Sequence, residues 1–297
     1  MDGVRRFALI LITVAGLAAG CGTSSVGSPA DSPVPDGIDP RNPNTERSTS
    51  SIDFAGVRTI RIEIPMGSVT VSQSNESGQA SLKVTEVILA KGLSNEALAE
   101  KLNGSAVSAG RSFVDDARLD IQAAIADGLA DPDISFDVRL VIPSGASVEV
   151  FVADGPVQVT NLSGNVEIHT ANGAVTVSGI DGNLVARTTL KAVSVDDVTG
   201  NVQVETTAAD ITLRLAPAPS GVASAKTSEG TIHMNIAQAT AASLSLSAPE
   251  GQISTNLSGF SISNLSTGDG FLTGVLNGGG GQIEAVATKG RIEFVGT

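Results

Sequence analysis

The strongest constraint on the fold is an internal repeat of 18 residues. The dipeptide Gly-Asn occurs at 164–165, 182–183 and 200–201, and extending this register back to Ala146 aligns four repeats. A unit that recurs at a fixed period cannot bury its apolar face alone and has to stack on its neighbours. The apolar residues then form five columns: Val148, Val166, Leu184 and Val202; Val150, Ile168, Ala186 and Val204; Val157, Val175, Val193 and Ile211; Val159, Val177, Val195 and Leu213; Leu162, Ile180, Val198 and Ala216.

Each repeat contains two stretches in which apolar and polar residues alternate, and the two stretches lie nine residues apart. Alternation with a period of two is typical of β-strands that have one face inside and one face in solvent. Successive repeats stacked about 4.8 Å apart are joined by backbone hydrogen bonds. The pattern therefore predicts an all-β fold, a β-solenoid or β-helix-like stack with two short strands per repeat. Gly155, Gly164, Gly182 and Gly200 are assigned to its turns.

The composition agrees with thin aliphatic layers. The chain has 297 residues, with 33 Gly, 8 Phe and no Trp or Tyr. β-Branched residues suit pleated surfaces and glycine suits tight turns, so a core without large aromatic residues has to be filled by aliphatic side chains. Thr170, Thr188 and Thr206 add a polar ladder to these layers.

The repeat continues less regularly on both sides of 146–216. Towards the C-terminus we expect the stack to continue to residue 297, interrupted by loops near 216–226, 237–242 and 258–280. The glycine-rich stretch 268–274 is predicted to be a flexible loop. Strands also dominate 53–140, where 94–103 is predicted to form one short helix. We interpret this part as the irregular beginning of the same β-structure, and a separate domain is the alternative.

The N-terminus is typical of an exported protein. Arg5 and Arg6 precede an apolar run of 13 residues, 7–19, which is shorter than the about 20 residues that a membrane-spanning helix needs. Residues 1–20 are therefore predicted to be a signal peptide. The small residues before Cys21 resemble the bacterial lipobox, whose cysteine receives diacylglycerol, although Ala18 stands where the commonest lipobox has Leu. The alternative is an ordinary secretory signal with an incidental cysteine.

Residues 21–50 are rich in Ser, Pro, Gly and Asp, which predicts a disordered linker between the lipid and a folded domain at 51–297. The formal net charge is −13, and no basic run follows the first six residues. Nucleic acid and anionic lipid both require clustered Lys and Arg, so neither is an expected partner. We expect a membrane-anchored, extracytoplasmic protein whose membrane contact is the lipid on Cys21.

The sequence offers no recognisable catalytic constellation. His169 and His233 lie on the polar phase of predicted strands, are expected to face water, and match no metal-ligand spacing. No nucleophile elbow occurs, and the glycines of 268–274 lack the spacing of a dinucleotide-binding loop. We therefore expect no catalytic residue, no metal site and no cofactor. The outward positions of the repeats are mostly small or polar, with Arg187 and Lys191 isolated.

Three segments resemble the DUF4097 group of bacterial envelope proteins, which are regarded as adhesins. They are 54–71, 138–150 and the run of G-x-V-x-V turns over 155–213, and the step Ile142-Pro143-x-Gly145 is characteristic. The resemblance covers about 53–297. It implies a β-solenoid outside the cytoplasm and supplies no established catalytic residues.

The leading hypothesis for the function is a non-catalytic envelope lipoprotein that acts as an adhesin or structural binding module, with an unidentified envelope or surface ligand. One alternative is a β-helix enzyme that acts on polysaccharide. A second alternative is a self-assembling scaffold, because bare ends of a β-stack can associate.

Overall fold

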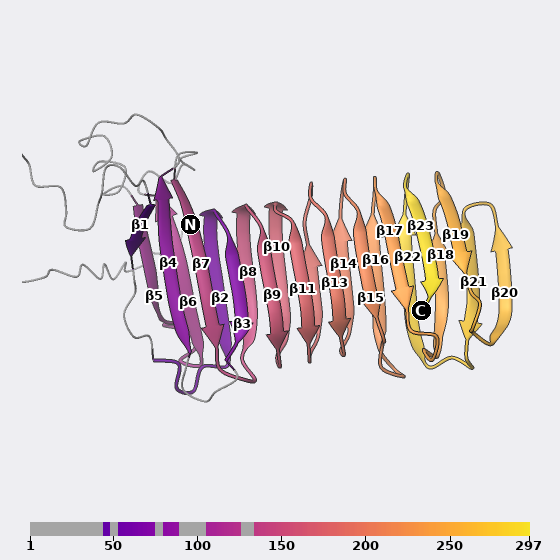
Figure 1. The fold of residues 1–297 in the computed structure, drawn as a ribbon, viewed down its shortest axis with the longest axis horizontal. Coiled ribbons are helices and arrows are strands. Elements are labelled where there is room, and N and C mark those ends of the chain that lie inside the picture. The colour runs from indigo at the N-terminus through magenta and orange to yellow at the C-terminus, as the bar shows by residue number, and fades with distance from the viewer. Residues whose placement is uncertain (1–43, 48–52, 75–79, 89–104, 126–133) are drawn as a thin grey trace, which may run out of the picture.

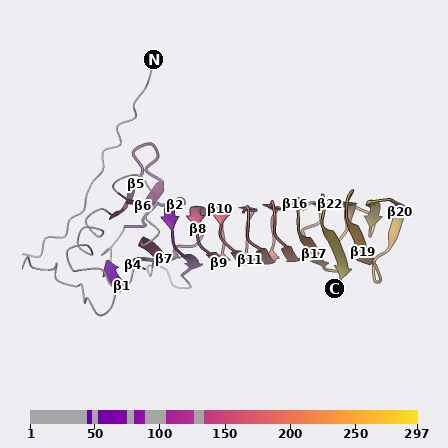
Figure 2. The same ribbon diagram turned by 90° about the horizontal axis from the view of Figure 1, so that it is seen from above.

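The computed structural model describes residues 44–47, 53–74, 80–88, 105–125 and 134–297. They form two sheets of 11 and 12 strands, called sheet A and sheet B below. The sheets lie as two layers along an elongated body (Figures 1 and 2). The described residues contain no helix, and hence none that could span a membrane. The helix predicted at 94–103 lies outside them.

In sheet A the order is β1 (Asn44–Arg47), β4 (Ser81–Ile88), β7 (Ile134–Ile142), β3 (Val69–Gln73), β9 (Val157–Leu162), β11 (Val175–Ile180), β13 (Val193–Val198), β15 (Ile211–Leu215), β17 (Thr231–Ile236), β23 (Arg291–Gly296) and β19 (Gln252–Asn256). In sheet B the order is β20 (Ile262–Gly268), β21 (Phe271–Leu276), β18 (Ala242–Ser247), β22 (Gly281–Ala287), β16 (Val222–Thr227), β14 (Val202–Thr206), β12 (Leu184–Arg187), β10 (Val166–Asn172), β8 (Ser147–Asp154), β2 (Thr59–Met66), β6 (Arg118–Ile125) and β5 (Ser105–Arg111). β1 lies inside the range predicted as linker.

The 18-residue register is confirmed by the strand pairing. Each repeat contributes one strand to sheet B and the next strand to sheet A, and we call such a pair a coil. Parallel pairing places Val148, Val166, Leu184 and Val202 side by side in sheet B, and Val157, Val175, Val193 and Ile211 side by side in sheet A. These residues are at most 2% exposed. The architecture is thus all-β, with parallel sheets stacked as in a β-helix.

The turns explain why Gly-Asn recurs. A Cβ atom on Gly182 would overlap the carbonyl oxygen of Gly164, and Gly164 and Gly200 are placed alike. Gly155 has φ +133°, and a Cβ there would overlap the carbonyl of Gly67. Each asparagine side chain then bonds to the next coil. Asn165 Oδ1 accepts from the Asn183 amide (3.0 Å), and Asn183 Oδ1 accepts from the Asn201 amide (2.9 Å).

At the N-terminal end the coils do not follow the order of the chain. The first coil, β2–β3, pairs with β8 and β9 on one side. On its other side it pairs with β6 and β7, which come later in the sequence. The strands within 53–142 therefore belong to the same two sheets as the regular repeats, and the first coil is inserted between two later ones.

The C-terminal end repeats this arrangement. The last coil, β22–β23, pairs with β16 and β17 on one side and with β18 and β19 on the other. The chain thus builds the outer coil β18–β19 and the antiparallel hairpin β20–β21 before it returns to fill the gap. Strands of the stack continue to Gly296, but their order in space departs from their order in the chain, because the repeat pattern specifies the strands and not the order in which they stack.

Two predicted loops contain strands. Within 216–226, β16 begins at Val222, and its inward residues are Ala223 and Ala225, whose small side chains weakened the apolar pattern. Within 258–280 lie β20 and β21, so the stretch 268–274 is not a flexible loop. It holds the turn of an antiparallel hairpin, in which Gly270 has φ +72°.

Candidate functional site

Charged and aromatic side chains gather on the outer face of sheet B. Alternate residues of each strand point outward, and the parallel register aligns them in rows across the coils. One row consists of Asp120, Arg61, Glu149 and Glu167. The next row consists of Gln122, Glu63, Phe151, His169, Arg187 and Glu205. We call these ten residues the sheet B ladder.

Planar groups stack at the centre of the ladder. The Phe151 and His169 rings are parallel, with 2° between their planes and 5.1 Å between their centroids. The Arg61 guanidinium lies 4.3 Å from the centroid of the Phe151 ring. Strand spacing in a sheet is about 4.8 Å, so planar side chains at equivalent positions of successive coils meet face to face. The stack brings three partly buried side chains into mutual contact on the outer face of sheet B.

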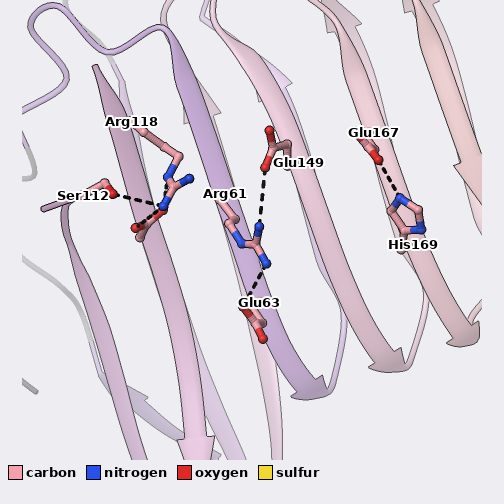
Figure 3. Close-up of polar contacts among 8 residues, drawn as sticks. Arg61, Glu63, Ser112, Arg118, Glu149, Glu167 and His169 are labelled. Carbon is pink, nitrogen blue, oxygen red and sulfur yellow. Dashed lines mark hydrogen bonds and ion pairs between the residues drawn. The ribbon is translucent and has the colours of Figure 1, made fainter. Parts of the chain in front are cut away.

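Ion pairs order the side chains around this stack (Figure 3). Arg61 lies between two carboxylates, 3.4 Å from Glu63 and 3.9 Å from Glu149. His169 Nε2 is 2.7 Å from the Glu167 carboxylate, within the same strand. Arg187 Nε is 3.4 Å from the Glu205 carboxylate of the next coil. These side chains are a third to a half exposed, so each pair contributes at most about 1 kcal/mol to stability. Their main effect is to hold the side chains in place.

Arg118 closes the ladder at its N-terminal end. Its Nε lies 2.8 Å from Asp120 Oδ1, and its terminal nitrogen donates to Ser112 Oγ at 3.0 Å (Figure 3). The hydrogen bond to Asp120 raises the pKa of the guanidinium above its ordinary value. The carboxylate of Asp120 is therefore held by a permanent positive charge.

An open groove of about 740 Å³ follows the second row of the ladder where the strands of sheet B end. The ladder residues that line it are Glu63, Phe151, His169, Arg187 and Glu205. Pro65, Ala153 and Ala171 line it as well, and the two alanines are exposed. The groove crosses six adjacent strands, from β6 to β14, so it is about 24 Å long at the usual strand spacing. Its shape suits an extended chain that runs across the coils.

The structure separates the residues singled out in the sequence. Cys21 lies outside the described residues, and the four turn glycines lie in the corners of the stack. Both histidines point outward and are half-buried: His169 belongs to the ladder, whereas His233 lies on sheet A, 2.9 Å from Glu293. No group of three or more His, Cys, Asp or Glu side chains that could hold a metal occurs in the part of the chain that the structure describes.

The interpretation of Arg187 as an isolated charge is wrong. Arg187 pairs with Glu205, 18 residues later in the chain, and stands next to His169 in the same row. Phe151, His169, Arg187 and Glu205 follow one another at the repeat spacing. That spacing is the signal in the sequence that points to this row, and it lies in the outward positions rather than in the apolar columns.

No protein-family model matches the chain, and no curated protein matches its sequence. Three solved structures are similar over most of it. One is "a putative cell adhesion protein" from Clostridium sporogenes, 9% identical, with a TM-score of 0.37, covering 86% of this chain and 99% of the other. Another is "a putative adhesin" from Bacteroides fragilis, 13% identical, with a TM-score of 0.39, covering 87% and 100%. A third is "putative adhesin" from Parabacteroides distasonis, 12% identical, with a TM-score of 0.29, covering 85% and 97%. At TM-scores below 0.5 these similarities do not establish a role for this chain.

Proposed function

We propose that this chain is a lipid-anchored, non-catalytic binding module that displays a β-solenoid of the DUF4097 type outside the cytoplasm. The observation that carries the proposal is the sheet B ladder, in which a planar stack and close polar pairs stand along an open groove across successive coils. The ladder residues Glu63, Phe151, His169, Arg187 and Glu205 line this groove. A ligand that lies along the groove meets side chains that are already ordered, and binding then costs little conformational entropy.

The chemistry of the groove favours a neutral chain rich in hydroxyl groups, such as an uncharged glycan. Donors and acceptors are mixed along it: His169 and Arg187 stand between Glu63 and Glu205. A hydroxyl group both donates and accepts, so it can bond to either kind. The ladder contains five carboxylates and two arginines, which repel an anionic polymer.

The pairing of the carboxylates supports binding rather than catalysis. Four of the five carboxylates of the ladder have an arginine within 4 Å, and the fifth, Glu167, has the ring of His169. A glycosidase requires two carboxyl groups that flank the scissile bond, one to protonate the leaving group and one to attack or activate water. Carboxylates that are held by arginine or histidine serve better as fixed acceptors for ligand hydroxyl groups. The alternative of a polysaccharide-active enzyme is therefore the weaker one.

Replacing Arg187 by Ala is expected to lower the affinity for neutral glycans about ten- to a hundredfold, because a hydrogen bond to a charged group contributes about 1.5–3 kcal/mol. The measurement is binding of the full chain to an array of neutral and anionic glycans, followed by titration of the best neutral ligand. Arg214→Ala is the matched control, since Arg214 pairs with Asp196 at 3.5 Å on the opposite sheet. Equal binding by both variants, or binding of anionic glycans alone, would contradict the assignment of the groove.

Removing the thiol of Cys21 is expected to abolish lipidation and release the protein from the membrane. Cys21 is the only cysteine, and the segment before it has the form of a lipoprotein signal. The measurement is metabolic labelling with a fatty-acid analogue in cells that express the wild type or Cys21→Ala. Labelling of the wild type alone supports the anchor, whereas equal labelling of both chains removes it from the proposal.

A further inference from the structure

At the C-terminal end of the body the two sheets stop at different places. Among the described strands, sheet A ends at β19, whose one partner is β23. Sheet B continues beyond the same coil by two strands, β21 and β20. Figure 1 shows this end with β20 outermost. The end is therefore a step, in which neither outer strand has a neighbour on its outer edge among the residues that the structure describes.

The two outer strands are uncovered. In β10, within the stack, side chains alternate between buried and partly exposed, but β19 has one partly buried and four exposed residues, and six of the seven residues of β20 are exposed. Two apolar side chains lie open to solvent here: Leu265 is 51% exposed and Phe271 is 43% exposed. A groove of about 510 Å³ runs between the start of β19 and the tip of the hairpin.

The step also lacks the charges that usually protect a sheet edge. Exposed edge strands commonly carry Lys or other charges, or Pro, which prevent another strand from pairing with them. At the opposite end, β1 contains Glu46 and Arg47 and β5 contains Arg111. β19 (QISTN) and β20 (ISNLSTG) contain no charged residue and no Pro. The only charges that line the groove are Asp269 and Arg291, and Arg291 already bonds to Gln252 (3.0 Å).

We propose that this end binds a second copy of the same chain, with the two steps interlocked about a two-fold axis. The β20 edge of each copy then lies against the β19 edge of the other, so that one operation satisfies both uncovered edges, as in an isologous interface. The charge supports a second copy. A chain with net charge −13 repels another like it, so two copies meet best through edge strands that contain no carboxylate, as β19 and β20 do. The chain's own segment 21–43 is a poor occupant, because its prolines interrupt strand pairing.

The test is the number of chains per particle, measured for the full chain in detergent by size-exclusion chromatography with light scattering. The wild type is expected to contain two chains. Ser254→Lys with Ser266→Lys, which places one lysine on each open edge, is expected to contain one chain and to keep the β-sheet circular dichroism. Ser194→Lys with Gln203→Lys adds the same charge to exposed sites in the middle of each sheet and should leave two chains.

A wild type that contains one chain at every concentration overturns the proposal, and leaves the step free for a strand of another protein. An edge variant that still contains two chains overturns it as well, because association would then come from the lipid anchor or another surface. Neither result bears on glycan binding by the sheet B ladder.

Discussion

Deleting residues 281–297 is expected to release far more of the chain than it removes. In a stack whose coils have the same order in space as in the sequence, loss of the last coil exposes only the coil before it. Here the last coil joins two parts. Among the described strands, β19 pairs with β23 alone, and β18 retains only the hairpin strand β21 once β22 is gone. Ile292 and Phe294 are fully buried in this coil, and burial of each contributes about 1.5–3 kcal/mol. Residues 242–280 should therefore undock.

Limited proteolysis of the truncated full chain with chymotrypsin measures this release. We expect rapid cleavage after Phe260 and Phe271, together with continued protection of the regular repeats over 146–215. Replacing β20–β21 by a short Gly-Ser linker is the control, because it removes a comparable length at the same end but keeps β18–β19 paired with β22–β23. Protection of 242–256 in the truncated chain would show that the outer coil can dock directly on β16 and β17.

The regular part of the stack was predictable because one spacing specifies both strands and register. Once Gly164, Gly182 and Gly200 are aligned, every residue of 146–213 has an assigned neighbour 18 positions away. If the pairing register of a strand shifted by one residue, its buried apolar side chains would face solvent. The hydrophobic effect therefore stabilises the observed register. The columns at Val148 and Val157 are accordingly found as expected.

The ends were not predictable in the same way. Pairing of β2 with β8 joins residues nearly 90 positions apart. A repeat period of 18 does not indicate that the first coil lies between two coils formed later in the chain. The hairpin β20–β21 could have been found, because Asp269-Gly270 is a dipeptide typical of tight turns between antiparallel strands. The abundance of glycine around it favoured the interpretation as a loop.

The candidate site likewise has a part that the sequence predicts and a part that it does not. Phe151, His169, Arg187 and Glu205 form a column that the repeat alone predicts. Arg61 and Glu63 complete the stack and the ion pairs only because the first coil is inserted beside β8. The repeat therefore aligns six of the ten ladder residues, since Glu149 and Glu167 are also 18 positions apart. The crossover at the N-terminal end places the other four, which belong to β2 and β6.

Gly182→Ala is expected to lower the free energy of unfolding by about 3 kcal/mol, the sum of an overpacking cost and of weakened hydrogen bonds. The added methyl group would overlap the backbone carbonyl of Gly164, and backbone cannot move aside as a flexible side chain can. The coils have to separate at this corner. That movement weakens the bond from the Asn183 amide to Asn165 Oδ1 (3.0 Å) and the bond from the Gly200 amide to the Gly182 carbonyl (3.2 Å).

Gly110→Ala separates this effect from the general consequence of replacing a glycine. Gly110 lies in β5, and a Cβ atom there would meet nothing within 4 Å. Alanine at an unstrained position restricts the unfolded chain and stabilises a protein by about 0.4–1 kcal/mol. Urea unfolding of the full chain should therefore shift in opposite directions for the two variants. A Gly182→Ala midpoint close to that of the wild type would contradict this expectation. It would mean that the coils can separate at this corner at little cost. Glycine would then recur here because of its backbone conformation, and not because the coils approach too closely for a side chain.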